Sequence, residues 1–161
     1  MRSITLIRQN HALEHATVAM LLQSGVRPPM GGYSTAGGFF IFGRVRFELV
    51  TQAAEEALDR LKQGQADLAI SPYCGTNLVT GALLSGLLTA AIMGRGENRL
   101  RRVPTAAVAV ICATLLSRPL GNAIQRRYTT LADVRGMEIV RIRRLWGIPL
   151  VYRISTTVSP G

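Results

Sequence analysis

Apolar residues recur at helical spacing from Ile4 to Gln23, and they occupy two opposite faces of the predicted helix. A helix that is apolar on two sides is usually enclosed by other elements, so we expect this one to be buried. Its N-cap is expected at Ser3 and its end just before Gly25, which two prolines follow. The pattern therefore predicts one long, enclosed helix at the start of the chain.

The pattern changes after this helix. Met30–Gly38 is rich in glycine and is expected to be a loop, while the β-branched and aromatic residues of Phe39–Leu49 predict two strands or one bent strand. Because a strand rather than a helix follows the glycines, they do not form a phosphate-binding loop. A second helix is expected from Thr51, its cap, to Gly64, and its charges complement the helix dipole. Asp67–Ile70 is predicted as a short strand.

Two uncharged segments lie in the middle of the chain, with four arginines in the loop between them. Thr76–Gly94 approaches the ~20 residues that a membrane-spanning helix needs, and Val103–Ser117 is shorter. Gly81, Ser85 and Thr89 recur at four-residue spacing, which suits close contact between helices in lipid. These segments predict a transmembrane helical hairpin. A helical hairpin buried in a soluble core is the alternative.

The last part of the chain is predicted as a basic β-hairpin. Met137–Leu145 and Ile148–Thr156 are strand-like, with Trp146 and Gly147 as the turn, and their alternation gives one apolar and one basic face. These strands could complete a sheet with Phe39–Leu49. The predicted fold is an α+β membrane protein with an N-terminal region (1–75), a transmembrane helical hairpin (76–120), and a C-terminal β-hairpin (121–161) that packs on the N-terminal region.

Composition and charge favour a membrane partner over nucleic acid. The 161 residues are 48% hydrophobic and carry a net charge of +10, and Lys62 is the one lysine among 19 basic residues. The arginines cluster beside apolar segments without interleaved aromatic residues, so we expect anionic lipid headgroups as partners and no nucleic acid. A homo-oligomer or a larger membrane complex is also expected. The two cysteines give no disulfide framework.

The orientation in the membrane follows from two opposing rules. The four arginines between the apolar segments favour a cytoplasmic loop. The N-terminal region would then have to cross the membrane, although Met1-Arg2-Ser3 leads into a helix rather than a signal peptide. Because translocating this region is the larger obstacle, we place both termini in the cytoplasm, with the protein in the cell (inner) membrane.

The candidate chemistry lies in the first helix, at His11-Ala12-Leu13-Glu14-His15. On a helix His11 and His15 are about 40° apart on one face, within reach of one metal ion, and Glu14 lies at the edge of that face. Hydrogen bonds could satisfy the two imidazoles instead. Cys74 is the other candidate, because the start of an apolar helix favours the thiolate form that binds metal or attacks electrophiles. It could also be a small packed residue, as we expect for Cys112.

Several segments together resemble an uncharacterised family of small bacterial and cyanobacterial membrane proteins. They are Arg8–Thr17, the glycine-aromatic segment Gly38–Gly43, and Cys74-Gly75-Thr76-Asn77 before the apolar hairpin. Separately, His11–His15 is similar to the inverted zinc motif of the pitrilysin-like metallopeptidases. That resemblance implies two histidine ligands to zinc and a glutamate, Glu14, that activates water. The downstream glutamate ligand of that family has no counterpart here, because the chain around position 90 is apolar.

The leading function is a membrane-associated zinc hydrolase of the metallopeptidase kind. His11, His15 and Cys74 would hold zinc, and Glu14 would be the general base. The alternative is a non-catalytic membrane subunit or assembly factor in which the His-Glu-His cluster is structural or holds a cofactor. A weaker alternative makes Cys74 a nucleophile with a histidine as its base.

Overall fold

The computed structural model describes residues 2–94, 99–145 and 150–159. The chain forms two compact units. The first combines Met1–Ser71 with Arg126–Gly161, and the second is Pro72–Gln125. The turn predicted at Trp146 and Gly147 lies outside the described residues.

The first unit contains a four-stranded antiparallel sheet in the order β1-β2-β4-β3. Its strands are β1 (Met30–Thr35), β2 (Gly38–Gly43), β3 (Met137–Leu145) and β4 (Val151–Val158). The central strands β2 and β4 pair with Phe39 opposite Ile154 and Ile41 opposite Tyr152. The strands from the two ends of the chain therefore join in one sheet, as the alternation predicted.

The expectation that Met30–Gly38 is a loop is wrong. Its first six residues form β1, and Tyr33 pairs with Phe40 across the β1–β2 hairpin. Glycine weakens a strand, but here the antiparallel ladder with β2 satisfies the backbone of the segment. The tight turn then falls at Ala36 and Gly37, between the two strands.

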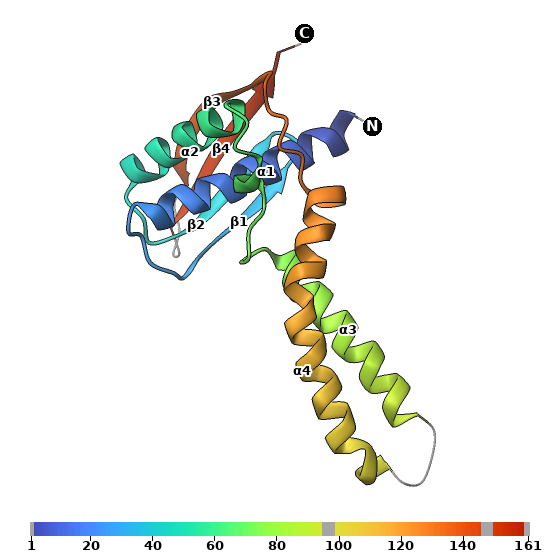
Figure 1. The fold of residues 1–161 in the computed structure, drawn as a ribbon. Helices are drawn as coiled ribbons and strands as arrows, with labels where there is room; N and C mark the ends of the chain where they lie inside the picture. Colours follow the sequence, from blue (N-terminus) through green and yellow to red (C-terminus); the bar gives the residue numbers. More distant parts are fainter. Residues whose placement is uncertain (1, 95–98, 146–149, 160–161) are drawn as a thin grey trace. The chain divides into compact units, whose positions relative to one another are not determined.

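Two helices of the first unit, α1 (Arg2–Gln23) and α2 (Phe47–Lys62), lie side by side on one face of the sheet (Figure 1). The inward side chains of β2 and β4 meet them in a core that includes Leu13, Met20 and Val50. Helix α1 is the enclosed helix that the periodicity predicted. The N-cap expected at Ser3 is wrong, because Ser3 already lies within the helix.

Helix α2 begins four residues before the predicted cap, Thr51. Phe47–Leu49 was expected to be strand, but it forms the first turn of the helix, where the Phe47 ring packs against Tyr152 with ring centroids 6.3 Å apart. Thr51 donates its hydroxyl hydrogen bond back to the Phe47 carbonyl, within the helix. Tertiary packing against the sheet therefore overrides the β preference of these residues.

The segment predicted as a strand at Asp67–Ile70 is instead a 3₁₀ turn, η1 (Ala66–Ala69). The Leu68 and Ile70 amides donate to the carbonyls of Gln65 and Asp67, which is the three-residue spacing of that helix. Ala69 is fully buried, and η1 packs against α1. This turn presents its last carbonyl to the first helix.

The second unit is a hairpin of two helices, α3 (Gly75–Met93) and α4 (Arg99–Ile124), each long and apolar enough to cross a membrane. Their large apolar side chains, such as Leu83 and Leu115, are exposed. Small residues lie between the helices: a Cβ added to Gly81 would be 3.1 Å from Ser117 Cβ. The predicted close-contact face is therefore confirmed at Gly81.

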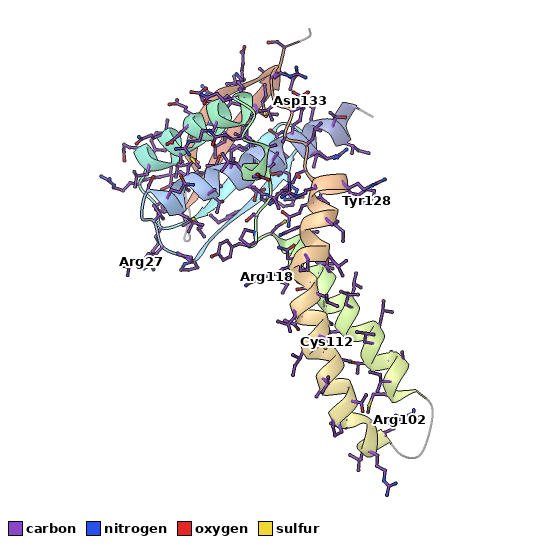
Figure 2. The ribbon with its side chains drawn as sticks, in the orientation of Figure 1. Arg27, Arg102, Cys112, Arg118, Tyr128 and Asp133 are labelled. Atoms are coloured by element: carbon purple, nitrogen blue, oxygen red, sulfur yellow. The ribbon has the colours of Figure 1, made fainter. Side chains whose placement is uncertain are left out.

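The polar end of this hairpin is closed by amide hydrogen bonds. Gln125 Nε2 donates to Asn77 Oδ1 at 2.9 Å, and Asn77 Nδ2 donates to the Pro72 carbonyl at 3.1 Å. Asn77 packs directly against Gly121, where a Cβ would lie 2.0 Å from Asn77 Oδ1. The packing role expected for Cys112 is wrong, because this residue is exposed on α4 (Figure 2).

Candidate functional site

The two histidines of the motif meet on one face of α1. The ring centroids of His11 and His15 are 4.3 Å apart, with their planes at 59°. One ring nitrogen of each lies within 4.8 Å of a ring nitrogen of the other. His15 is 4% exposed and His11 is half-buried. The structure therefore brings the two predicted ligands together, at a separation that one metal ion can bridge.

Each imidazole is oriented by a backbone carbonyl. His11 Nδ1 is 3.0 Å from the Thr129 oxygen, and His15 Nδ1 is 2.7 Å from the Ala69 oxygen. A carbonyl oxygen can only accept, so Nδ1 is the donor in both rings. In the neutral imidazole the lone pair then belongs to Nε2. Histidines that bind metals commonly donate their other ring nitrogen in this way, so these hydrogen bonds leave Nε2 of each neutral ring as the ligand atom.

The two carbonyls come from short irregular turns. Ala69 ends the 3₁₀ turn η1, and Thr129 ends a π-helical turn, η2 (Gln125–Thr129). Such π-helical turns occur frequently at functional sites.

The segment after η2 is held along α1 by residues that precede the motif. Arg8 Nη2 donates to the carbonyls of Arg127 and Thr130 at 3.0 and 3.1 Å, and the Leu131 amide donates to the Arg8 carbonyl. Gln9 Nε2 donates to the Asp133 carbonyl at 2.7 Å. Arg8 and Gln9 therefore help to position the Thr129 carbonyl. The sequence reasoning missed this role, although both residues lie within three positions of the motif.

Asn10 is a second positioning residue that the sequence reasoning missed. It is fully buried, and its Nδ2 donates to the Thr35 carbonyl at 2.9 Å. Its Oδ1 accepts a hydrogen bond from Thr156 Oγ1 at 2.6 Å. Asn10 thus ties α1 to β1 and β4, one residue before His11. A polar residue at a position expected to be enclosed was the available signal.

Glu14 points toward strand β1. Its Oε2 accepts a hydrogen bond from Ser34 Oγ at 2.6 Å, and the residue is 7% exposed. Gly32 lies directly against it, since a Cβ built on Gly32 would be 2.3 Å from Glu14 Oε1. The carboxylate therefore occupies a slot that exists because residue 32 has no side chain.

Cys74 caps α3, in the second unit. Its Sγ accepts a hydrogen bond from the Thr76 amide at 3.4 Å. Thr76 and Asn77, which follow it, lie inside the helix. The role of Cys74 as a third metal ligand stays a prediction.

Fold and site together define a small mixed α+β protein with two helices that could span a membrane and a histidine pair that could bind a metal. The family described as Domain of unknown function (DUF6391) matches residues 6–142, and the chain belongs to this family. Over 140 residues it is 36% identical to an uncharacterized protein of Picosynechococcus sp. (strain ATCC 27264 / PCC 7002 / PR-6), covering 81% of this chain and 68% of that protein. No solved structure matches the chain. The expected membership in an uncharacterised family with a cyanobacterial relative is thus confirmed, while the resemblance of His11–His15 to the inverted zinc motif stays a prediction.

Proposed function

We propose that this protein is a membrane-associated zinc hydrolase of the metallopeptidase kind, with His11 and His15 as two of its zinc ligands. The observation that carries the proposal is the pair of Nδ1–carbonyl hydrogen bonds, which give both rings the ligand tautomer before any metal binds. Catalytic zinc sites use three protein ligands and keep a fourth position open for water or substrate. The proposal therefore requires a third ligand.

Cys74 is the proposed third ligand. It follows Ala69 by five residues, and the Ala69 carbonyl is the group that orients His15. Five residues of extended chain reach at most about 17 Å, so the linker is long enough for Cys74 to reach a metal ion that the two histidines hold. Its position at the N-terminus of α3 favours the thiolate, which is the form that binds zinc.

The catalytic role in the proposal falls to Glu14. Zinc at such a site lowers the pKa of a water molecule and polarises a carbonyl group. Glu14 would accept the proton that the water loses. The hydrogen bond from Ser34 fixes the Glu14 carboxylate, and the Ala69 carbonyl fixes the His15 ring, so both groups are held in place before substrate binds.

Membrane insertion is part of the same proposal. Helices α3 and α4 would cross the cell membrane as a hairpin, with both termini in the cytoplasm and the short loop outside. Their exposed leucines and valines would contact lipid tails, and arginines that follow the second apolar segment, such as Arg118 and Arg126, would contact anionic headgroups. Self-association or entry into a larger membrane complex belongs to this proposal as well.

One observation favours a second candidate, a non-catalytic membrane subunit or assembly factor. The Glu14 carboxylate accepts a hydrogen bond from Ser34 and packs against Gly32. A carboxylate with a purely structural role would be held in the same way. In that case Glu14 would join α1 to β1, and the histidines would be structural or would hold a cofactor without catalysis.

Metal analysis of the purified full-length protein tests the site. We expect about one zinc per chain in the wild type and its loss in His11→Ala, His15→Ala and Cys74→Ser, while Cys112→Ser, the matched control, keeps it. A wild type that carries no metal and keeps its stability in a chelator would refute the metal site. Loss of zinc in both histidine variants but not in Cys74→Ser would remove only the third ligand.

Glu14→Gln separates the two candidates. As a general base Glu14 contributes roughly 10²–10⁴ in rate, so the variant should keep its zinc and fold but lose hydrolysis of membrane peptides by that factor. A wild type that hydrolyses no membrane peptide and co-purifies stoichiometrically with other subunits favours the second candidate. Weakened zinc binding or lower stability of Glu14→Gln would also favour the second candidate.

A further inference from the structure

The outer face of the sheet, opposite α1 and α2, carries aromatic and basic side chains in adjacent rows. The inward residues Phe39, Ile41, Tyr152 and Ile154 are fully buried against the helices, so the residues that alternate with them point to the other face. The strand register places the outward residues Tyr33, Phe40, Arg153 and Arg143 side by side, one on each strand. We call this surface the outer sheet face.

Two rings on this face are stacked on each other, and a guanidinium group covers one of them. The Phe40 and Phe42 rings are stacked, with centroids 6.4 Å apart. The Arg153 guanidinium lies over the Phe40 ring, 4.4 Å from its centroid, and donates to Thr35 Oγ1 and the Gly37 carbonyl. Tyr33 is 63% exposed on the edge strand. The face thus carries a group of stacked planar side chains and, beside it, one exposed ring.

The charge on the outer sheet face is positive. The register places Arg141 and Arg143 on β3, next to Ser155 and Arg153 on β4, and both β3 arginines are exposed. Among the described residues of these strands, the one acid on this face is Glu138, at the far end of β3. The arginines stand beside the aromatic residues, although the two groups lie far apart in the sequence.

We propose that the outer sheet face binds single-stranded nucleic acid. Bases stack on aromatic rings and on guanidinium planes, and a basic strand alongside them attracts the phosphates. Tyr33, Phe42 and the Arg153–Phe40 pair supply the stacking surfaces, and Arg141 and Arg143 supply the charge. The expectation of no nucleic-acid partner depended on the absence of interleaved aromatic residues along the chain, and the strand register interleaves them in space.

Two other partners fit this face less well. An acidic polypeptide would be attracted by the arginines but would leave the stacked rings without a function. A bilayer surface is bound by apolar side chains that project into it, whereas Phe40 lies under a guanidinium and both phenylalanines are half-buried. The stacked planar groups, the exposed Tyr33 and the neighbouring arginines therefore favour bases and phosphates as ligands.

Fluorescence anisotropy with full-length protein in uncharged detergent micelles tests the proposal. The probes are fluorescein-labelled oligouridylate and oligo(dT), with a blunt DNA duplex for comparison, each measured over a range of salt concentrations. We expect both single strands to bind more tightly than the duplex. Tyr33→Ala should weaken binding by about fivefold or more. Tyr128→Ala, which removes an equally exposed ring (64%) away from the sheet, should not (Figure 2).

A second matched pair of variants tests the contribution of the arginines. Arg143→Gln should lower the slope of log affinity against log salt by about 0.7, the value for one phosphate contact on a single strand. Arg27→Gln, which removes an exposed arginine outside the sheet, should leave the slope unchanged (Figure 2). Equal effects of Tyr33→Ala and Tyr128→Ala, or equal competition by polyglutamate and oligouridylate, would overturn the proposal in favour of unspecific charge. If no oligonucleotide binds in uncharged detergent and the protein binds instead to vesicles of anionic lipid, the proposal would be overturned in favour of a lipid partner.

Discussion

Gly32→Ala should distort the site from outside the motif. The added methyl group would lie 2.3 Å from Glu14 Oε1 and 2.6 Å from Glu14 Cγ, so the carboxylate has to leave its slot. Gly32 has no positive φ, so the substitution acts through this contact and not through backbone strain. We therefore expect a large effect from the smallest possible side chain.

The magnitude follows from two losses. Overpacking of this kind costs about 1–3 kcal/mol. Displacing Glu14 also breaks the 2.6 Å hydrogen bond from Ser34, and a hydrogen bond to a charged group contributes about 1.5–3 kcal/mol. Because the side chain can relieve part of the overlap as it moves, we expect a loss of about 2–5 kcal/mol in the free energy of unfolding.

Urea unfolding of the full-length protein in uncharged detergent micelles, followed by circular dichroism, measures this loss. Gly31→Ala is the matched control, since nothing lies within 4 Å of a Cβ at Gly31. The double variant Gly32→Ala/Glu14→Ala should be no less stable than Glu14→Ala alone, because the added methyl group then has space. Equal losses of unfolding free energy in Gly31→Ala and Gly32→Ala would refute the close packing of Glu14 against Gly32. Full additivity in the double variant would refute it as well.

Three further predictions concern other parts of the molecule. Burial raises the pKa of Tyr152 above its ordinary 10.0, so the unfolded chain loses this proton at lower pH than the folded protein does. The free energy of unfolding should therefore fall as pH rises above about 10. Urea titrations should show a smaller fall of this free energy in Tyr152→Phe. Gly121→Ala should loosen the α3–α4 hairpin, because its methyl group would lie 2.0 Å from Asn77 Oδ1, whereas Gly86→Ala meets nothing within 4 Å; cross-linking between cysteines introduced into the two helices measures this, and equal yields would contradict it. In intact cells a membrane-impermeant thiol reagent should modify Asn98→Cys but not a cysteine near the C-terminus, and the reverse pattern would invert the proposed orientation.

Two helices were predicted well because their own sequences mark them, the first by its apolar periodicity and the second by its uncharged composition. Ile4–Gln23 and Thr76–Gly94 are helices in the structure almost to the predicted residue. The strand β1 was missed because its glycines have low strand preference, and pairing with β2 decides its conformation. The first turn of α2 was missed for the opposite reason, since Phe47 has high strand preference but packs on Tyr152 from a helix.

The site was predictable as far as one helix determines it. Spacing alone placed His11 and His15 on one face, and the structure confirms this contact. The groups that orient the rings are backbone carbonyls 118 and 54 residues further along the chain, at Thr129 and Ala69. Any residue type can supply a carbonyl, so no sequence pattern marks these two positions. Gly32 is similar, because its role depends on which side chain lies against it.

The pairing of β2 with β4 also restricts how the chain can cross a membrane. Backbone hydrogen bonds join Phe39 to Ile154, residues that precede and follow the α3–α4 hairpin. Two strands of one sheet have to be in the same compartment, so the chain between them crosses the bilayer an even number of times or not at all. A single crossing, with α3 or α4 alone in the membrane, would separate β2 from its partner. The sheet thereby fixes the parity of the topology before either helix is assigned a direction.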